Sequence, residues 1–168
     1  MIMQDEPGCM AQMVALYEKT GGNIVAVQEC DPAEAHKYGI VGRGRGAGDG
    51  FEITEMVEKP PKGTAPSNFY LNGRYILQPE IFDILAGQER GAGNEIQLTD
   101  GMLKLKDRQD FYAYPFAGRT FDCGSPEGFV EANIALSLLR DDMKERIGGS
   151  LASLLAEAEA TRKKRSRA

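Results

Sequence analysis

The sequence predicts an α/β protein with a mixed sheet, and three observations support this class. Short runs of apolar and aromatic residues, typical of strands, alternate with segments whose apolar residues recur at helical spacing. The segment 38–58 has the pattern of a hairpin inserted among these elements, which adds antiparallel strands. The chain has 168 residues, of which 42 % are hydrophobic, so it is long enough to bury a core.

The first part of the chain contains a helix and a buried strand. The run 23–30 is almost continuously apolar, as expected of a strand that is covered on both faces. Asp31 followed by Pro32 has the pattern of an N-cap before a brief helical turn. Before them, a helix that ends at Gly21 and Gly22 is predicted by four residues at helical spacing, Met10, Met13, Val14 and Tyr17.

The middle of the chain is predicted to hold the hairpin, a strand and a short helix. The hairpin at 38–58 consists of a short strand, a glycine-rich tip and a returning strand. A further strand at 69–77 is bounded by prolines on both sides. The short helix is expected to point Ile81, Phe82 and Leu85 inward and to end at Gly87.

The last part of the chain alternates again between helix and strand. A helix is expected to start near Thr99, and 111–116 suits a strand that Pro115 restricts to an edge or a strand end. Ser125 and Pro126 begin a helix with Val130, Ile134 and Leu138 on one stripe. We expect Gly148 and Gly149 to end that helix and Ser150 to cap a final one, which gives a main domain at 1–147 and a terminal helix with a basic tail at 148–168.

The overall composition argues against several classes of partner. The net charge is −5, so the chain has no overall positive field to attract nucleic acid or an anionic membrane. No apolar run approaches the length that is needed to span a bilayer. Three cysteines form an odd set without metal-ligand spacing. Reduced thiols and a cytoplasmic location are the corresponding predictions.

Two motifs invite functions that their context does not support. Gly42, Gly44 and Ala47 match the loose dinucleotide pattern G-x-G-x-x-G/A, which requires a helix to follow it. The segment that follows has the pattern of a strand, so a hairpin loop is the better interpretation. His36 is the single histidine and lacks cysteines or carboxylates at zinc-ligand spacing, so we expect an exposed or satisfied loop histidine.

Glu58 and Lys59 stand side by side where a strand must end, because two prolines follow them. Successive strand residues point to opposite faces, but a chain that curls at a strand end can direct both side chains into one cleft. There a lysine ammonium can neutralise a phosphate and a carboxylate can accept hydrogen bonds from sugar hydroxyls. A solvated surface pair is the alternative interpretation.

Asp122 lies in the segment TFDCGSPEG, immediately before a predicted helix. A carboxylate beside a helix N-terminus suits a magnesium ion that bridges a bound phosphate. The same aspartate also suits a turn in which it accepts hydrogen bonds from backbone amides. Both interpretations are open from the residues alone.

Five motifs, taken together, resemble one known family. They are KYGIV (37–41), VEKP (57–60), APSNFYLNGRYIL (65–77), GAGNEIQLTD (91–100) and FDCG (121–124). In their order and spacing they resemble the bacterial UTP–glucose-1-phosphate uridylyltransferases, which are sugar-phosphate nucleotidyltransferases. The resemblance runs from about residue 5 to about residue 145 and implies a Rossmann-like nucleotidyltransferase fold with a mixed sheet.

The resemblance also implies roles for particular residues and a reaction. Gly39 would offer its backbone to the sugar, Glu58 would bind glucose hydroxyls, and Lys59 would bind the phosphate of glucose 1-phosphate. Leu71 would lie against the sugar with Tyr75 nearby, and Asp122 would be one of two aspartates that hold Mg2+. A sugar-phosphate oxygen would attack the α-phosphorus of UTP, releasing pyrophosphate and forming UDP-glucose.

The chain departs from the family pattern in its first residues. The G-x-G-T-R loop, the P-K motif and the second magnesium aspartate of family members do not occur in it. The resemblance therefore implies an incomplete domain, the C-terminal portion of a longer enzyme, and we expect the 168 residues alone to be inactive. A partial sheet would expose strand edges, which favours self-association into a homo-oligomer. The alternatives are a non-catalytic sugar-phosphate-binding or dimerisation module, and a thymidylyl or cytidylyl branch of the superfamily.

Overall fold

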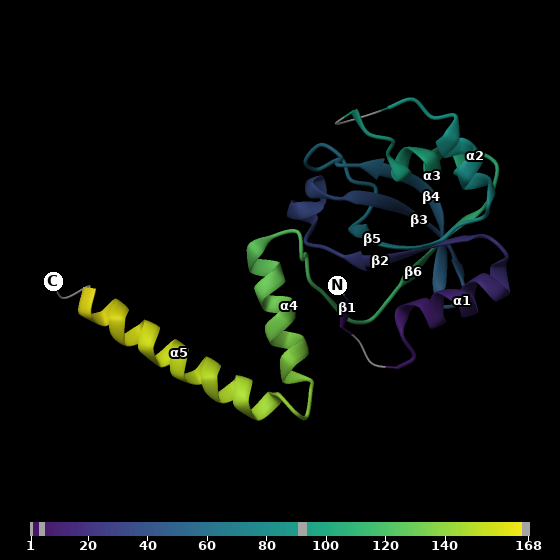
Figure 1. Ribbon diagram of the computed structural model, residues 1–168. Coiled ribbons are helices and arrows are strands. Elements are labelled where there is room, and N and C mark those ends of the chain that lie inside the picture. The colour runs from purple at the N-terminus through teal and green to yellow at the C-terminus, as the bar shows by residue number, and fades with distance from the viewer. Residues whose placement is uncertain (1, 4–5, 91–93, 166–168) are drawn as a thin grey trace. The chain divides into compact units, whose positions relative to one another are not determined.

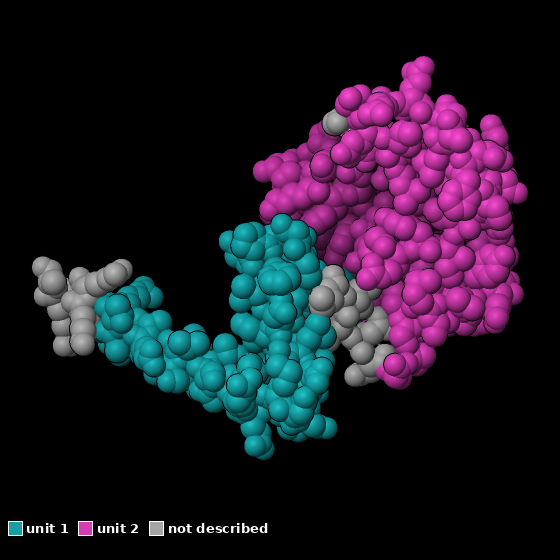
Figure 2. Space-filling model, viewed as in Figure 1, with its two compact units in different colours: residues 1–4, 118–168 teal, residues 5–117 magenta. Residues whose placement is uncertain are grey.

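The computed structural model describes residues 2–3, 6–90 and 94–165 and contains two compact units (Figures 1 and 2). Unit 2 comprises residues 5–117, and unit 1 comprises residues 1–4 and 118–168. The GAG of the predicted motif at 91–100 and the last three residues of the basic tail lie outside the described residues.

Unit 2 contains five of the strands and most of the helices. In chain order these elements are α1 (Cys9–Thr20), β2 (Asn23–Glu29), the 3-10 helix η1 (Pro32–Lys37), β3 (Gly39–Ala47), β4 (Gly50–Glu58), β5 (Phe69–Ile76), α2 (Glu80–Ala86), α3 (Leu98–Lys106) and β6 (Phe111–Pro115). Helix α1 contacts β2 and β5, whereas α3 contacts β4 and packs with α2 (Figure 1). All the predicted strands and helices of this region are therefore present.

The strands of unit 2 form a closed ring in the order β2, β5, β3, β4, β6. Strands β2 and β6 pair in parallel, and every other pair is antiparallel, so the predicted mixed sheet is confirmed. Because each strand has two neighbours, the ring has no open edge. The expectation of exposed strand edges is therefore wrong for these five strands, and homo-oligomer formation stays a prediction without that support.

The first strand of the hairpin is longer, and its tip is shorter, than the sequence predicts. Strand β3 continues to Ala47 and β4 begins at Gly50, so the glycines at 42 and 44 belong to a strand and not to a loose tip. Gly50 sits where a side chain would meet the carbonyl oxygen of Ala113 at 2.4 Å, which explains why glycine begins β4. A strand follows the G-x-G-x-x-A match, as predicted, so no helix N-terminus receives a ligand there.

The core of unit 2 lies between the strands and the pair of helices α2 and α3. Its central cluster comprises Val25, Val27, Val41, Phe51, Ile53, Met56, Phe69, Ile81, Met102, Leu105, Phe111 and Ala113. A methyl group added at Gly101 would lie 2.8 Å from Leu85 Cδ2 and 3.3 Å from Ile81 Cδ1, so glycine lets α2 and α3 approach closely. Phe82, which the sequence places inward, is 72 % exposed because Ile81 and Leu85 form the face that α3 covers.

Helix α1 buries a different face from the one that the apolar spacing marks. Its buried residues are Cys9, Met13 and Leu16, while Met10 and Val14 are 44 % and 43 % exposed. Both the predicted set and the set with Cys9, Met13 and Leu16 fit a helical period. The second set is buried because that side of α1 contacts β2 and β5.

Unit 1 contains β1 (Ile2–Met3), β7 (Arg119–Thr120), α4 (Pro126–Leu138) and α5 (Lys144–Arg165). The two short strands pair antiparallel, which the sequence does not predict. The predicted cap of α4 is confirmed, since Ser125 Oγ accepts a hydrogen bond from the Gly128 N–H at 3.1 Å. Among the described residues, no helix combines the length and the apolarity that crossing a bilayer requires.

The break between α4 and α5 lies earlier than the sequence predicts. Helix α5 runs through Gly148, Gly149 and Ser150, so neither the break nor the cap at these positions is correct. Each glycine costs a helix only about 1 kcal/mol relative to alanine, which disfavours but does not end it. The turn lies at 139–143, where Arg140 pairs with Asp142 at 2.8 Å. The division of the chain at 147 and 148 stays a prediction.

The fully buried Asn23 joins three segments of unit 2 at the start of β2. Its amide Nδ2 donates to Gln109 Oε1 at 3.0 Å and to the Asp110 carbonyl at 3.2 Å, and its Oδ1 accepts from the Gln78 N–H at 2.8 Å. Asn23→Ala leaves a backbone N–H without its acceptor, so we expect the free energy of unfolding to fall by about 2 kcal/mol.

Urea denaturation measures this loss, and Asn72→Ala is the matched control in the same unit. Asn72 is half-buried and donates to Gln28 Oε1 alone, so its replacement should cost less than about 1 kcal/mol. Equal losses for the two variants would contradict the role of Asn23 as a junction.

Candidate active site

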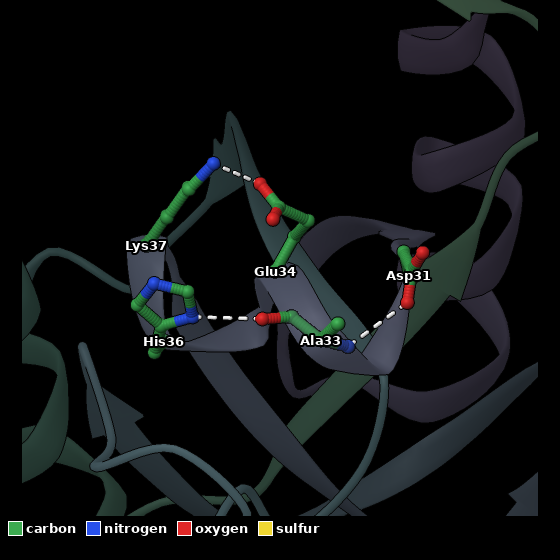
Figure 3. Close-up of polar contacts among 5 residues, drawn as sticks. All are labelled: Asp31, Ala33, Glu34, His36 and Lys37. Carbon is green, nitrogen blue, oxygen red and sulfur yellow. Dashed lines mark hydrogen bonds and ion pairs between the residues drawn. The ribbon is translucent and has the colours of Figure 1, made fainter.

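A short helical turn leads the chain into the hairpin (Figure 3). In η1 the Asp31 carboxylate accepts the Ala33 N–H at 2.9 Å, and His36 Nδ1 lies 2.9 Å from the Ala33 carbonyl oxygen. Lys37 donates to Glu34, a contact that lowers the pKa of Glu34 and raises that of Lys37. His36 is thus satisfied locally, as predicted, and Lys37 is paired within the turn.

Gly39, the first residue of β3, faces the end of the opposite strand. Gly39 of β3 pairs with Glu58 of β4 in the antiparallel register. A methyl group added at Gly39 would lie 2.8 Å from Glu58 Oε2 and 3.2 Å from Leu71 Cδ1. The glycine therefore leaves a space that a carboxylate oxygen and a leucine methyl border directly. Three residues that the resemblance assigns to substrate binding meet at this point.

Tyr75 belongs to the same neighbourhood. Tyr75 and Leu71 pair with Val25 and Val27 of β2 on the two sides of a register shift, and both side chains pack against the core cluster. Burial raises the pKa of Tyr75, a backbone hydrogen bond at Gly73 opposes the rise, and the negative charge of Glu58 adds to it. We call Gly39, Glu58, Leu71 and Tyr75 the sugar-side cluster.

Lys59 follows the last residue of β4 in an uncommon backbone conformation. Its φ is 45°, and Lys59 and Asn94 are the two non-glycine residues with positive φ in the described part of the chain. The Lys59 N–H donates to the Tyr38 carbonyl at 3.0 Å, and Pro60 behind it is fully buried. The Lys59 side chain is exposed, and none of the ion pairs found among the described residues involves it. The strand ends before the prolines, as the sequence predicts, and the chain turns there.

Two tyrosines that the sequence does not single out border the same strand ends. The rings of Tyr38 and Tyr70 lie with their centroids 4.8 Å apart and their planes tilted by 31°. Tyr70 pairs with Ile40 of β3 and points to the face of β5 opposite Leu71. The sequence shows only that each of the motifs 37–41 and 65–77 contains one of these tyrosines. It does not show their contact, because the contact depends on long-range strand pairing. We call these two residues the aromatic pair.

Asp122 lies in unit 1, in a tight turn before α4. Its Oδ1 accepts the Gly124 N–H at 3.0 Å, and its carbonyl oxygen accepts from the Ser125 N–H at 3.2 Å. A side chain at Gly128 would lie 2.1 Å from that carbonyl oxygen, so the turn requires glycine there. The Asp122 carboxylate therefore accepts a backbone hydrogen bond within the turn, as the turn interpretation predicts. Asp122 is also exposed.

The metal-binding and catalytic roles of Asp122 stay predictions. Asp122 belongs to unit 1 and the sugar-side cluster to unit 2, so its placement relative to Lys59 is likewise a prediction. Within residues 2–3, 6–90 and 94–165, no group of three or more His, Cys, Asp or Glu side chains is arranged to hold a metal ion. An exposed single carboxylate is nevertheless the kind of ligand that Mg2+ combines with substrate phosphates.

Curated proteins of known name are similar to this chain. A UTP–glucose-1-phosphate uridylyltransferase of Staphylococcus epidermidis is 41 % identical over 144 residues, which are 86 % of this chain and 50 % of that protein. UTP–glucose-1-phosphate uridylyltransferase 2 of Staphylococcus saprophyticus is 42 % identical over 146 residues, which are 87 % of this chain and 50 % of that protein. The chain spans about half the length of the curated relatives it matches.

Solved structures give the same result for the fold. A UDP-glucose pyrophosphorylase complexed with UDP-glucose matches with a TM-score of 0.74 at 42 % identity, over 83 % of this chain and 53 % of that chain. The UTP-bound enzyme from Acinetobacter baumannii matches with a TM-score of 0.81 at 28 % identity, over 92 % of this chain and 53 % of that chain. The family model described as nucleotidyl transferase matches residues 2–137. The chain therefore belongs to the nucleotidyl transferase family.

Proposed function

We propose that the protein carrying this chain transfers a uridylyl group from UTP to glucose 1-phosphate, giving UDP-glucose and pyrophosphate. The names of its curated relatives and the nucleotidyl transferase match support this reaction class. The observation that carries the proposal is the sugar-side cluster, where Gly39, Glu58 and Leu71 meet next to the exposed Lys59. Glu58 would then accept hydrogen bonds from the sugar hydroxyls, and Lys59 would bind the phosphate of the same glucose 1-phosphate molecule.

The cluster has the chemistry that a hexose requires. A sugar is a neutral polyol, so its hydroxyls need acceptors, and the Glu58 carboxylate offers two oxygens. The missing side chain at Gly39 lets the sugar approach the backbone, which also provides hydrogen-bonding groups. Leu71 and Tyr75 present carbon surface on which the apolar faces of the ring can lie.

Lys59 supplies the charge that the other half of the ligand requires. Its ammonium is exposed at the strand end, beside Glu58 and unlike the paired Lys37. In the proposed reaction it binds the phosphate of glucose 1-phosphate and orients an oxygen for attack on the α-phosphorus of UTP. The attacking phosphate is already anionic, so the reaction needs no general base, and positioning with charge neutralisation dominates.

Mg2+ is the proposed cofactor, and Asp122 is its proposed ligand from this chain. The exposed carboxylate fits a hard cation that prefers oxygen ligands and that shares its coordination with substrate phosphates. When bound, the ion neutralises charge that develops on the phosphates of UTP. A cytoplasmic location, a homo-oligomeric state and the inactivity of the 168 residues alone stay predictions.

Gly39→Ala tests the space in the sugar-side cluster. The added methyl group would crowd Glu58 Oε2 and Leu71 Cδ1. We expect the dissociation constant for glucose 1-phosphate to rise about tenfold, because this is the effect of losing one hydrogen bond to a charged group. Gly46→Ala is the matched control, because Gly46 lies on the same strand and an added methyl group would meet nothing within 4 Å. Isothermal titration calorimetry measures both constants, and equal affinities in the two variants would rule out the cluster as the sugar site.

Lys59→Ala tests the phosphate contact. Loss of a charge-assisted hydrogen bond is expected to raise the dissociation constant for glucose 1-phosphate about 10- to 100-fold. Affinity for glucose, which lacks the phosphate, should be unchanged. Lys62→Ala, three residues along in the same exposed segment, controls for the general loss of one positive charge. If Lys59→Ala and Lys62→Ala bind glucose 1-phosphate equally well, the role of Lys59 is wrong.

Asp122→Ala tests the reaction itself, in the protein that carries this chain. Formation of UDP-glucose from UTP and glucose 1-phosphate should fall at least about 100-fold, while glucose 1-phosphate binding persists. Asp141→Ala removes an exposed carboxylate from the same unit and should leave the rate unchanged. Faster turnover with dTTP or CTP than with UTP would favour the thymidylyl or cytidylyl branch. Binding of the sugar phosphate without any transfer would favour a non-catalytic module.

A further inference from the structure

The backbone at Lys59 requires an explanation beyond the end of a strand. Its φ of 45° lies in the left-handed region, which residues with a side chain rarely adopt and which costs free energy. A residue before proline also prefers extended backbone, and Pro60 follows. Such a conformation persists only where the surrounding structure holds it in place.

The contact that holds Lys59 comes from the residue before β3. The Lys59 N–H donates to the Tyr38 carbonyl at 3.0 Å, and the Tyr38 N–H donates to the Ala35 carbonyl at 3.2 Å. The backbone of Tyr38 is therefore bonded on one side to η1 and on the other to Lys59. Its side chain is 39 % exposed and has its ring against Tyr70. The ring contact restricts the Tyr38 side chain, and the Tyr38 backbone is held at both its N–H and its carbonyl oxygen.

Tyr70 provides a fixed surface for that ring contact. It pairs with Gln28 of β2 and with Ile40 of β3, the one register pair that joins β3 and β5. Its hydroxyl donates to Gln28 Oε1 at 3.0 Å, and Asn72 donates to the same oxygen at 2.8 Å. Residues from β2 and β5 thus anchor the ring on which Tyr38 rests.

We propose that the aromatic pair, Tyr38 and Tyr70, is a positioning device that sets the backbone of Lys59 and so the site that its ammonium reaches. A lysine side chain is long and flexible, so the direction in which it leaves the backbone decides which site its ammonium can occupy. The aromatic pair fixes that direction through the Tyr38 carbonyl. This inference rests on the proposed function, in which Lys59 binds the phosphate.

A double-mutant cycle separates positioning from direct contact with the ligand. We expect Tyr38→Ala to weaken glucose 1-phosphate binding about fivefold, which is the scale of one aromatic pair, and to leave binding of free glucose unchanged. In the Lys59→Ala background, Tyr38→Ala should have no further effect, because the group that it positions is absent. Tyr38→Phe retains the ring and should bind like the parent. Additive losses, or weaker binding of free glucose, would overturn the inference.

Amide hydrogen exchange tests the same inference without any ligand. Tyr38→Ala should speed exchange of the Lys59 amide by up to about tenfold, because the free energy lost with one aromatic pair corresponds to a change of that size in the opening equilibrium. Exchange of the Thr64 amide, which donates to the Pro61 carbonyl at 3.0 Å in the neighbouring turn, should not change. Unchanged exchange at Lys59 would refute the device. If Tyr38→Ala does not fold, Tyr38→Leu keeps an apolar contact but lacks the ring, and the same two outcomes apply.

The two levels of the proposal fail in different ways. If Lys59→Ala leaves glucose 1-phosphate binding unchanged, the proposed function of Lys59 is wrong, irrespective of the results for Tyr38→Ala. If Lys59→Ala weakens binding but Tyr38→Ala changes neither binding nor Lys59 amide exchange, the positioning role alone is overturned.

Discussion

The pairing of Gly39 with Glu58 across β3 and β4 is the constraint on which the candidate site depends. Side chains alternate between the two faces of a strand, so a shift of one residue would move Glu58 to the opposite face. The register also brings the start of β3 to the end of β4, which is why Tyr38 can accept a hydrogen bond from Lys59. Glycine at position 39 then leaves the Glu58 carboxylate accessible. The pairing of Gly39 with Glu58 therefore determines where the Glu58 carboxylate lies, the space beside it and the position of Lys59.

The site combines rigid support with local strain. Leu71 and Tyr75 pack against the core of unit 2, and Pro60, which follows the exposed Lys59, is fully buried, so these three residues cannot move freely. The strain at Lys59 costs about 1–3 kcal/mol, an amount that a packed core and a fixed hydrogen bond can sustain. Strained residues of this kind concentrate at binding sites, because a side chain held in advance loses less entropy when a ligand arrives. The positive φ at Lys59 therefore supports the proposal that this residue binds a ligand.

The order of the elements in unit 2 was predictable from the sequence, whereas the two short strands of unit 1, the buried faces of some helices and several element ends were not. Apolar spacing found α1, but the choice between the Met10 and Leu16 faces depends on which strands it meets. Gly148 and Gly149 lower helix propensity, yet the turn lies earlier in the chain, at 139–143, around the Arg140 and Asp142 pair. For the site, prolines marked Glu58 and Lys59, while Gly39, Leu71 and Tyr75 came from family resemblance alone. Tyr38 and Tyr70 were missed because their contact joins motifs that are far apart in the sequence.

The proposed roles are divided between the two units, with every sugar-phosphate contact in unit 2 and the proposed Mg2+ ligand in unit 1. Gly39, Glu58, Lys59, Leu71 and Tyr75 all belong to unit 2, which has its own core and a closed ring of strands. Recognition of the sugar phosphate then depends on the integrity of one compact unit. Asp122 belongs to unit 1, where its turn depends on Gly124, Ser125 and Gly128 and on no residue of the sugar-side cluster. Changes in the turn should therefore act on the transfer step, and changes in the ring on affinity. In the proposed function, loss of Asp122 therefore removes transfer while the unit that binds glucose 1-phosphate stays intact.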